Sequence, residues 1–433
     1  MDKLNAFSNL TTGIIPKIAK DYGTPVYIYD ESLLIEKCKD VLSMPNAFGL
    51  TVRYAMKANS NRTLLKIISS QGIHIDASSF NEVKRAGMAG IPYKNMMLTS
   101  QEVLSESDRT EMESLVLQGL TYNICSLRQM ELFAGFAAEN KVELSIRICP
   151  GVGSGESSTR NTGDKYSCFG VYLSDIPQAV NLANKYGLKF RMVHVHIGSG
   201  GEPEKWRENI DRELGLIETY FPDAEAVNFG GGLREARMPE ETKADIVVLG
   251  QYAKLQVEEF YKKTGRKLKM EIEPGTYLVA NAGYILTRIM DMKRTGESGL
   301  DFIILDGGLD VNARPLLYGA EHPFYLVSKT GCLLYSPFFP ELCQFEAVVV
   351  GCCCESGDSL CLDQGENNIP RKMKKPEIDD FVLIGGSGAY CSSMTPFNYN
   401  SHMQIPELLY DKNGQIKLIR RRQTMEQMLE NEI

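Results

Sequence analysis

Residues 52–61 read VRYAMKANSN, which is typical of a buried β-strand that delivers a lysine, Lys57, and then breaks into small polar residues. The end of a buried strand rarely carries a long cation without a function. One interpretation is a lysine whose methylenes pack on the core while its ammonium reaches solvent. The other is a nucleophile that forms a Schiff base with a carbonyl group. The two remain open on this stretch alone.

Seven further apolar runs of this kind follow the first, and segments with 3.6-residue periodicity separate them. The eight runs are Val52–Asn59, Ile73–Ser79, Met96–Ser100, Thr121–Cys125, Glu143–Pro150, Phe190–Gly198, Ala226–Gly232 and Lys269–Thr276. Strands that alternate with helices form a parallel sheet, and eight such units in succession predict a (β/α)8 barrel. We assign residues 31–283 to this barrel.

The pattern changes after about residue 284, where strand-like runs separated by glycine- and proline-rich turns dominate. These runs are Phe302–Asp306, Pro323–Val327, Cys343–Val350, Phe381–Ile384 and Gln415–Leu418. They predict an antiparallel β domain formed by residues 284–433 and joined by residues 1–30. Within it we expect residues 363–380 to form a solvent loop.

The composition is that of an ordinary globular protein, with 43% hydrophobic and 24% charged residues. A formal net charge of -8 disfavours nucleic acid as a partner. The sequence contains no signal-peptide-like start and no long apolar span, so we expect a cytoplasmic protein without a membrane partner. The eleven cysteines are therefore interpreted as reduced thiols. They form no CxxC pair, and no metal site is expected.

In a (β/α)8 barrel the chemistry takes place where the strands end. Three consecutive glycines, residues 230–232, end the seventh run, and their N–H groups suit either a phosphate or a tight turn. Glu273 lies near the end of the eighth run, where it could either pair with a cation or cap the next helix. His194 and His196 in the sixth run offer either two metal ligands or a flat ring that stacks on a cofactor. Because only His74 adds another histidine to the barrel strands, stacking is favoured.

The second domain contains three stretches that do not resemble plain scaffold. Residues 306–318 supply Arg314, whose guanidinium suits a carboxylate. Residues 351–358 supply Cys354, a candidate reactive thiol beside the acid Glu355. A glycine-rich turn at residues 385–390 ends in an aromatic residue with a polar tip.

These motifs occur in a recognisable order: YAMKANSN, HIGSG, FGGGL, EPGT, ARPLLY, CESGD and GSGAY. Over residues 20 to 420 the chain resembles the fold-type III decarboxylases that depend on pyridoxal 5'-phosphate (PLP). The CESGD and RPLLY forms are most similar to those of the diaminopimelate decarboxylases. The resemblance implies decarboxylation of meso-2,6-diaminopimelate to L-lysine, as a step of lysine biosynthesis. It also implies a homodimer in which the active site is shared across the interface.

The resemblance also implies a role for each residue of the site. Lys57 binds PLP covalently, and Cys354 returns a proton to the α-carbon. The residues implied to contact the cofactor are Lys57, His196, Ser199, Gly230, Gly231, Gly232, Glu273, Gly275 and Tyr390. Those implied to contact the substrate are Thr276, Arg314, Tyr318, Glu355 and Tyr390. His196 stacks on the cofactor ring, and Glu273 keeps its nitrogen protonated, which favours decarboxylation.

One motif departs from the family pattern, because EPGT stands where diaminopimelate decarboxylases generally have EPGR. A threonine hydroxyl cannot replace the ion pair that an arginine makes with the distal carboxylate of the substrate. Another arginine could replace it, and the candidates are Arg160, Arg234 and Arg237. Otherwise the substrate lacks that carboxylate, as in a decarboxylase of ornithine, lysine or arginine. A homologue that binds PLP without catalysis is a further alternative.

Overall fold

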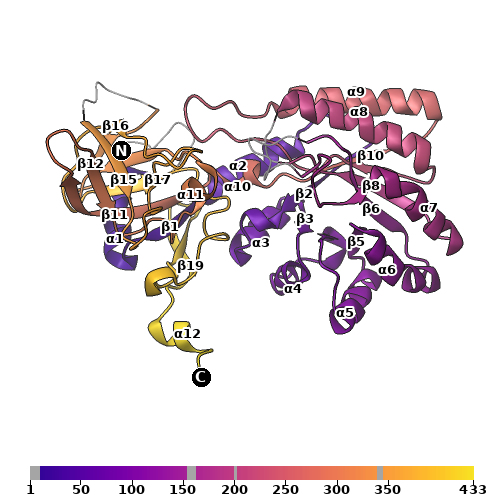
Figure 1. The fold of residues 1–433 in the computed structure, drawn as a ribbon, viewed down its shortest axis with the longest axis horizontal. Helices are drawn as coiled ribbons and strands as arrows, with labels where there is room; N and C mark the ends of the chain where they lie inside the picture. Colours follow the sequence, from indigo (N-terminus) through magenta and orange to yellow (C-terminus); the bar gives the residue numbers. More distant parts are fainter. Residues whose placement is uncertain (1–9, 154–161, 199–201, 339–344) are drawn as a thin grey trace. The chain divides into compact units, whose positions relative to one another are not determined.

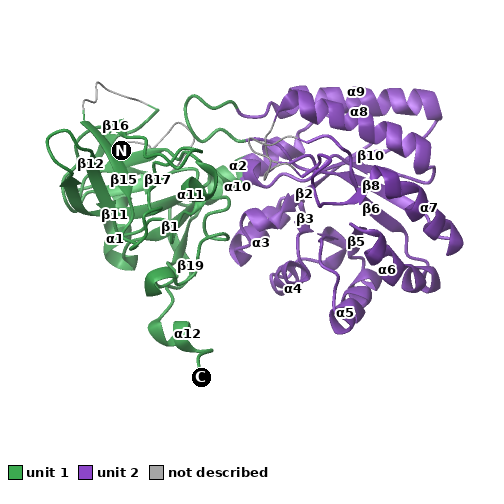
Figure 2. Ribbon diagram, viewed as in Figure 1, with its two compact units in different colours: residues 1–36, 235–242, 279–433 green, residues 37–234, 243–278 purple. Residues whose placement is uncertain are grey.

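The computed structural model describes residues 10–153, 162–198, 202–338 and 345–433, and the chain divides into two compact units (Figure 2). The barrel unit comprises residues 37–234 and 243–278, and the β unit comprises residues 1–36, 235–242 and 279–433. The return of residues 235–242 to the β unit was not indicated by the sequence pattern, which placed them inside a continuous barrel domain.

In the barrel unit, eight parallel strands of the described residues close into a ring. Each strand pairs with the next along the chain, β5 pairs with β6, and β10 pairs with β2. The strands are β2 (Leu50–Ala55), β3 (His74–Ala77), β4 (Met96–Thr99), β5 (Thr121–Ile124), β6 (Leu144–Cys149), β8 (Phe190–Val195), β9 (Ala226–Asn228) and β10 (Lys269–Ile272). A two-residue strand, β7 (Val171–Tyr172), pairs with β6 outside the ring. The predicted barrel is confirmed.

Helices surround the ring of strands (Figure 1). They are α3 (Arg62–Ser70), α4 (Phe80–Met88), α5 (Glu106–Leu117), α6 (Leu127–Asn140), α7 (Ile176–Lys185), α8 (Pro203–Tyr220) and α9 (Ile246–Thr264). Strands covered on both faces need no polar alternation, and β4 and β6 are buried along their whole length. The chain leaves the β unit for the barrel unit within α2 (Glu31–Leu42), and it returns to the β unit within α10 (Thr276–Val279).

The first helix after the lysine-bearing stretch shows how the sequence sets these elements. The side chain of Asn61 accepts a hydrogen bond of 2.8 Å from the backbone of Thr63 and so caps α3. Leu64, Leu65 and Ile68 form the buried face of this helix. Burial of each contributes roughly 1.5–3 kcal/mol. The small polar residues at the end of VRYAMKANSN therefore begin the helix that packs on β2.

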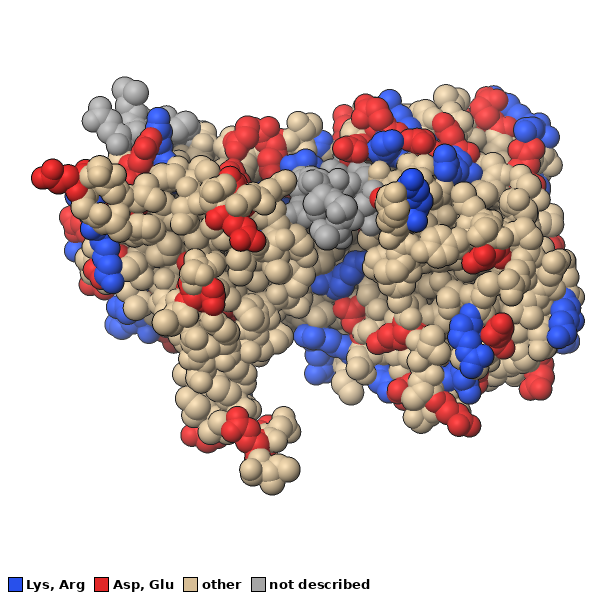
Figure 3. Space-filling model, in the orientation of Figure 1, with Lys and Arg blue, Asp and Glu red and all other residues tan. Residues whose placement is uncertain are grey.

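The surface of α8 and α9 carries charges of both signs, which Figure 3 shows interspersed. Lys263 of α9 pairs with Glu218 of α8 at 2.8 Å, and Lys205 pairs with Glu208 at 3.1 Å within α8. None of the helices in the described ranges is long and apolar enough to cross a membrane.

The β unit is built on one extended, branched sheet. Its strands are β1 (Val26–Asp30), β11 (Gly283–Arg294), β12 (Asp301–Leu305), β13 (Phe324–Val327), β14 (Leu333–Tyr335), β15 (Phe345–Val350), β16 (Arg371–Met373), β17 (Phe381–Ile384), β18 (Glu407–Tyr410) and β19 (Ile416–Arg420). Most neighbours are antiparallel, as predicted, but β1 pairs with β18 and β12 pairs with β15 in parallel. The helices of this unit are α1 (Ile15–Tyr22), α11 (Arg314–Tyr318) and α12 (Met425–Leu429).

The N-terminal strand β1 lies in the middle of this sheet, between β11 and β18. Val26 and Ile28 of β1 pack in a core with Tyr284, Leu383 and Leu408. This explains why residues 1–30 belong to the β unit. The solvent loop expected at residues 363–380 is wrong in part, because it contains β16, whose Met373 is buried against the sheet.

Candidate active site

Lys57 lies in the 3-10 turn η2 (Met56–Ala58), which follows β2 directly. Its side chain is exposed, whereas both neighbours are buried. The expected strand Val52–Asn59 is therefore shorter than predicted, because the chain tightens into a turn at the lysine. The positive charge of Lys57 acts on Asp76 of β3 and on His196, which follows β8. The ammonium thus stands among polar groups at the carboxyl ends of the strands.

Glu273, at the end of β10, is held by a chain of buried polar side chains. Asn228 donates to its Oε1 at 2.7 Å, and Nε2 of His194 lies 3.2 Å from its Oε2. On the far side, Nδ1 of His194 accepts from Nδ2 of Asn123 at 2.7 Å. The orientation of Asn123 follows from its Oδ1, which accepts from the hydroxyl of Ser145 at 2.8 Å. His194 therefore carries its proton on the nitrogen that faces Glu273.

These hydrogen-bonded side chains help to set the charge of the buried Glu273 carboxylate. Burial alone would raise the pKa of Glu273, but the hydrogen bond from His194 and the positive charge of Arg147 bring it to about 2. Glu273 is thus ionised at every working pH. A carboxylate offers about four lone-pair sites, so this one can still accept a bond from a cation in the barrel.

The glycines at residues 230–232 form a close turn against the end of β8. A Cβ on Gly230, whose φ is +67°, would stand 2.3 Å from the carbonyl oxygen of Val195. A Cβ on Gly231 would meet the carbonyl oxygen of Glu273 at 2.8 Å. Only glycine fits at these positions, and the absence of side chains lets a ligand approach the backbone closely. The N–H of Gly230 donates to Oδ1 of Asn228 at 2.9 Å, which fixes the turn.

The imidazole of His196 is fixed by the same turn. The backbone N–H of Gly231 donates to its Nδ1 at 3.1 Å, so a neutral ring carries its proton on Nε2. Burial, followed by the positive charge of Lys57, lowers the pKa of His196 well below its ordinary value. The ring is uncharged at neutral pH and suited to stack on a flat partner. The HxH pair with His194 belongs to no cluster of three metal-ligating side chains among the described residues.

The variant Gly230→Ala is expected to lower the free energy of unfolding by about 1–3 kcal/mol, because the new methyl overlaps backbone and takes an unfavourable φ. Urea denaturation followed by circular dichroism measures this loss. Gly135→Ala in α6 is the matched control, since a Cβ there meets nothing within 4 Å. It should leave stability unchanged or raise it by about 0.5–1 kcal/mol. Equal effects of the two variants would contradict this account of the turn.

In the β unit, Asp358 joins two of the stretches singled out in the sequence. Its Oδ1 accepts from the backbone of Leu309 at 2.6 Å, and its Oδ2 accepts from the backbone of Cys353 at 2.7 Å. A Cβ on Gly308 would stand only 1.9 Å from the same carboxylate. The glycines of residues 306–318 and the acid of the CESGD motif are therefore parts of one packed loop pair.

The next loop of the β unit orients Cys354 and Glu355. The backbone N–H of Cys354 donates to Oδ1 of Asn400 at 2.6 Å. The hydroxyl of Tyr399 donates to Glu355 at 2.9 Å, and this bond is the main cause that lowers the pKa of Glu355. The side chains of Cys354 and Glu355 are both exposed. The turn η6 (Tyr399–Ser401) thus presents a thiol and a charged carboxylate side by side.

Two arginines of the β unit have guanidinium nitrogens without a partner among the described residues. Arg237 donates from Nε to the carbonyl of Gly386 at 2.9 Å, but its buried Nη2 has no acceptor. The buried Nε of Arg314, at the start of α11, likewise has none. Burial, followed by the charge of Arg314, lowers the pKa of Arg237 to about 9, so it stays protonated at neutral pH. Two neighbouring cations with open donors fit an anion.

The remaining expected residues are placed as follows. The hydroxyl of Tyr318 contacts the sulfur of Met394 at 3.6 Å, and the ring of Tyr318 lies 5.7 Å from the Arg314 guanidinium carbon. Tyr390 is half-buried at a φ of +58°, a strained value typical of functional positions. Half-buried residues that follow β9 or β10 are Arg234, Gly275 and Thr276. Ser199 and Arg160 lie outside the described residues.

Sequence reasoning missed several of the side chains that position the others. Asn123 and Asn228 were readable as polar residues inside apolar runs, which is a signal of a buried network. His194 was named only as a possible metal ligand or stacking ring, and its contact with Glu273 was not foreseen. Tyr399 and Asn400 gave no such signal, because their partners lie about 45 residues away in the chain.

The barrel end fits a phosphorylated pyridine aldehyde, the chemistry of PLP. The turn of residues 230–232, which has no side chains, suits its phosphate, and the neutral ring of His196 suits its aromatic face. Ionised Glu273 suits a protonated ring nitrogen, and the amine of Lys57 suits its aldehyde.

Comparison with known proteins agrees with this fit. Residues 33–280 match the family model "Pyridoxal-dependent decarboxylase, pyridoxal binding domain". Diaminopimelate decarboxylase of Escherichia coli (strain K12) is 29% identical over 430 residues, 98% of each chain. That of Buchnera aphidicola subsp. Baizongia pistaciae is 31% identical, over 97% of this chain and 96% of the relative.

Solved structures extend the likeness to the whole fold. A crystal structure of diaminopimelate decarboxylase superimposes with a TM-score of 0.88 at 29% identity and covers 99% of each chain. The Helicobacter pylori diaminopimelate decarboxylase complexed with L-lysine gives a TM-score of 0.78 at 25% identity, over 96% of this chain and 98% of that one. The matched domain spans more than half of the chain, so this protein belongs to the family of pyridoxal-dependent decarboxylases.

Proposed function

We propose that this protein removes carbon dioxide from meso-2,6-diaminopimelate and releases L-lysine. The observation that carries the proposal is a pair of arginines in the β unit, buried Arg237 and half-buried Arg314, each with one buried guanidinium nitrogen that has no partner among the described residues. A diaminopimelate substrate keeps a second carboxylate at its far end, and such an anion would satisfy both donors. The diaminopimelate decarboxylases among its relatives support the same substrate.

In this proposal, bound PLP supplies an electron sink for the electron pair that the departing carboxylate leaves behind. Lys57 holds the cofactor covalently. Glu273 keeps a proton on the ring nitrogen, because its own pKa of about 2 keeps it ionised. His196 would stack on the ring, and the turn of residues 230–232, together with Ser199 and Gly275, would hold the phosphate.

The β unit supplies the proton and the substrate contacts. Cys354 gives the proton of its thiol to the α-carbon of the substrate, and Glu355, oriented by Tyr399, binds the substrate amine. The polar tips of Tyr318 and Tyr390 contact the substrate, and Tyr390 also contacts the cofactor. We propose further that the enzyme is a cytoplasmic homodimer in which Cys354 and Glu355 serve the barrel of the partner subunit.

Arg237 takes the place of the arginine that EPGT lacks. Arg234 is a weaker candidate, since it has no guanidinium nitrogen that is buried and without a partner, and Arg160 lies outside the described residues. Thr276 then contributes only a neutral hydrogen bond near the substrate.

A panel of substrates tests the proposal directly. Purified holoenzyme is given meso-diaminopimelate, L-lysine, L-ornithine or L-arginine, and carbon dioxide release is measured. We expect kcat/KM to be highest for meso-diaminopimelate. Faster turnover of ornithine would show that the open arginines do not select a second carboxylate, and that the enzyme decarboxylates a basic amino acid.

Arg237→Gln is expected to lower kcat/KM for meso-diaminopimelate about 10- to 100-fold, because a charged hydrogen bond contributes about 1.5–3 kcal/mol. The product L-lysine keeps the distal carboxylate, so its competitive inhibition should weaken by a similar factor. Inhibition by 1,5-diaminopentane, which has no carboxylate, should not change.

The matched control is Arg288→Gln, an exposed arginine of β11 that pairs with Asp379 at 3.3 Å in the same unit. It should leave kcat/KM for meso-diaminopimelate and the inhibition constants of L-lysine and 1,5-diaminopentane unchanged. If Arg237→Gln weakened lysine and diaminopentane equally, Arg237 would be a structural residue and would not bind the distal carboxylate.

A further inference from the structure

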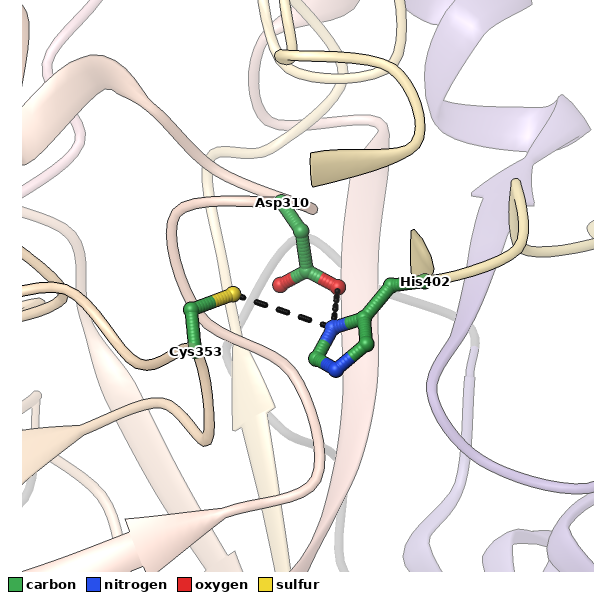
Figure 4. Close-up of side chains that lie close together, drawn as sticks. All are labelled: Asp310, Cys353 and His402. Carbon is green, nitrogen blue, oxygen red and sulfur yellow. Dashed lines mark hydrogen bonds and ion pairs between the residues drawn. The ribbon is translucent and has the colours of Figure 1, made fainter. Parts of the chain in front are cut away.

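Three side chains from distant parts of the chain converge in the β unit, as Figure 4 shows. Asp310 follows β12, Cys353 follows β15, and His402 precedes β18. Nδ1 of His402 lies 3.1 Å from Oδ2 of Asp310 and 3.7 Å from Sγ of Cys353. The three ligand atoms all lie within 4.8 Å of one another.

These separations are close to those of a metal site. A tetrahedral zinc ion with ordinary bond lengths places its sulfur and nitrogen ligands about 3.6 Å apart, and its nitrogen and oxygen ligands about 3.4 Å apart. The observed distances of 3.7 and 3.1 Å differ from these by about 0.1 and 0.3 Å. The sulfur of Cys353 and the oxygen of Asp310 lie within 4.8 Å, against about 3.6 Å in such a site, so side-chain movements of up to about 1 Å are needed.

The arrangement does not match a nucleophilic triad of cysteine, histidine and acid. In such a triad the acid contacts one imidazole nitrogen and the nucleophile contacts the other. Here Asp310 and Cys353 both contact Nδ1 of His402. Three groups that converge on one point can share an ion, whereas they cannot pass a proton along the ring.

The surroundings hold these ligands in place and leave room for one more. The second oxygen of Asp310 accepts from the backbone of Gly308 at 2.8 Å, as metal-binding carboxylates commonly do. Asn398 donates to the carbonyl of His402 at 3.0 Å. A small pocket of ≈ 10 Å³, about the space that one water molecule needs, is lined in part by Asp310 and His402 and can supply a water as fourth ligand.

The backbone before His402 is strained. Asn398, Asn400 and Ser401 take φ values of +60°, +50° and +59°. Each such residue costs of order 1–3 kcal/mol and persists where the surrounding structure requires the conformation. The strained turn is what brings the imidazole of His402 to the other two side chains.

We propose that Asp310, Cys353 and His402 bind a divalent ion of the zinc class, with water as the fourth ligand. A thiolate with an imidazole and a carboxylate selects zinc or cobalt over magnesium or calcium. The site is independent of the proposed decarboxylation. It would tie the residue that precedes Cys354 to the loop that orients Glu355, and so stiffen this part of the β unit.

Cobalt binding tests the site on the untagged, full-length protein loaded with PLP. After equilibrium dialysis we expect one cobalt ion per chain and the visible d–d absorption of four-coordinate cobalt. Cys353→Ser and His402→Ala should each weaken binding by more than about 100-fold, because each removes a ligand. Cys352→Ser, which changes the neighbouring thiol, should bind cobalt as the unchanged protein does.

Asp310→Asn keeps the shape of the side chain and removes its charge, and it should also weaken binding. If a substitution at Cys353 or His402 disturbs folding, the cobalt affinity of Asp310→Asn tests the site instead. The proposal is overturned if the unchanged protein retains no cobalt. It is also overturned if Cys353→Ser, His402→Ala and Asp310→Asn all bind cobalt as tightly as the unchanged protein.

Discussion

Lys57→Ala is expected to abolish decarboxylation, with a loss in kcat of about 10⁴-fold or more. The amine of Lys57 is the exposed cation at the end of β2, and its charge acts on Asp76 and His196. Without it the cofactor has no covalent attachment and no amine to exchange with the substrate. Steady-state assay of carbon dioxide release measures the loss, and the cofactor absorbance of the purified variant measures retention.

Lys66→Ala is the matched control, since Lys66 is an exposed lysine of α3 nine residues further along. It should retain full activity. A Lys57→Ala variant with more than a few per cent of the original kcat would contradict the assignment of Lys57 as the anchor.

The same variant tests whether the active site is shared. Cys354→Ala should be slowed strongly on its own, because it lacks the proposed proton donor. Mixed with Lys57→Ala under conditions that exchange subunits, it should recover part of the activity, since one site of each heterodimer is complete. Failure to recover any activity would exclude a site composed of two subunits.

Glu273→Gln is the second large expected effect. The amide has the size of the acid but carries no charge, so the ring nitrogen of the cofactor loses the anion that keeps it protonated. We expect kcat to fall about 10²- to 10³-fold, as for other preorganised charges in buried sites. Both oxygens of Glu273 accept from N–H donors, so the amide nitrogen must face either Asn228 or His194, and some stability should be lost as well. Activity is therefore compared per folded molecule.

Glu271→Gln, two residues earlier on β10, should lose stability but keep its activity. Glu271 pairs with buried Arg53 at 2.6 Å, and breaking a buried ion pair costs about 3–5 kcal/mol of stability. Activity per folded molecule should stay within a few-fold of the original. If instead Glu271→Gln abolished turnover and Glu273→Gln did not, the ring-nitrogen partner would be misassigned.

The barrel could be predicted from sequence because each of its strands is a local apolar run followed by its own helix. VRYAMKANSN is an instance, in which the strand, the lysine turn and the Asn61 cap lie within ten residues. The pairing of each strand with its successor then follows from chain order. This regularity is why the fold class was predicted correctly.

The β unit was predicted less completely, because its contacts join distant residues. β1 pairs with β18 almost 380 residues away, and no local pattern indicates a parallel partner. Arg237 was named only as one of three candidates. Its membership of the β unit, and its contact with Gly386, depend on a long-range fold of residues 235–242.

The absence of a metal site was expected from the lack of a CxxC pair, and our proposal revises that expectation. Asp310 and His402 are 92 residues apart, and a spacing rule detects only ligands that are close in sequence. His402 was set aside because it lies outside the barrel strands. Its partners become apparent only when β12, β15 and β18 are placed in one sheet.

The most direct test of the account is the covalent position of the cofactor. Holoenzyme is reduced with borohydride, digested, and its peptides are mapped by mass spectrometry. The account predicts one pyridoxyl group per chain, on the peptide that contains Lys57. A label on any other lysine, or no label on a protein that retains PLP, would contradict it.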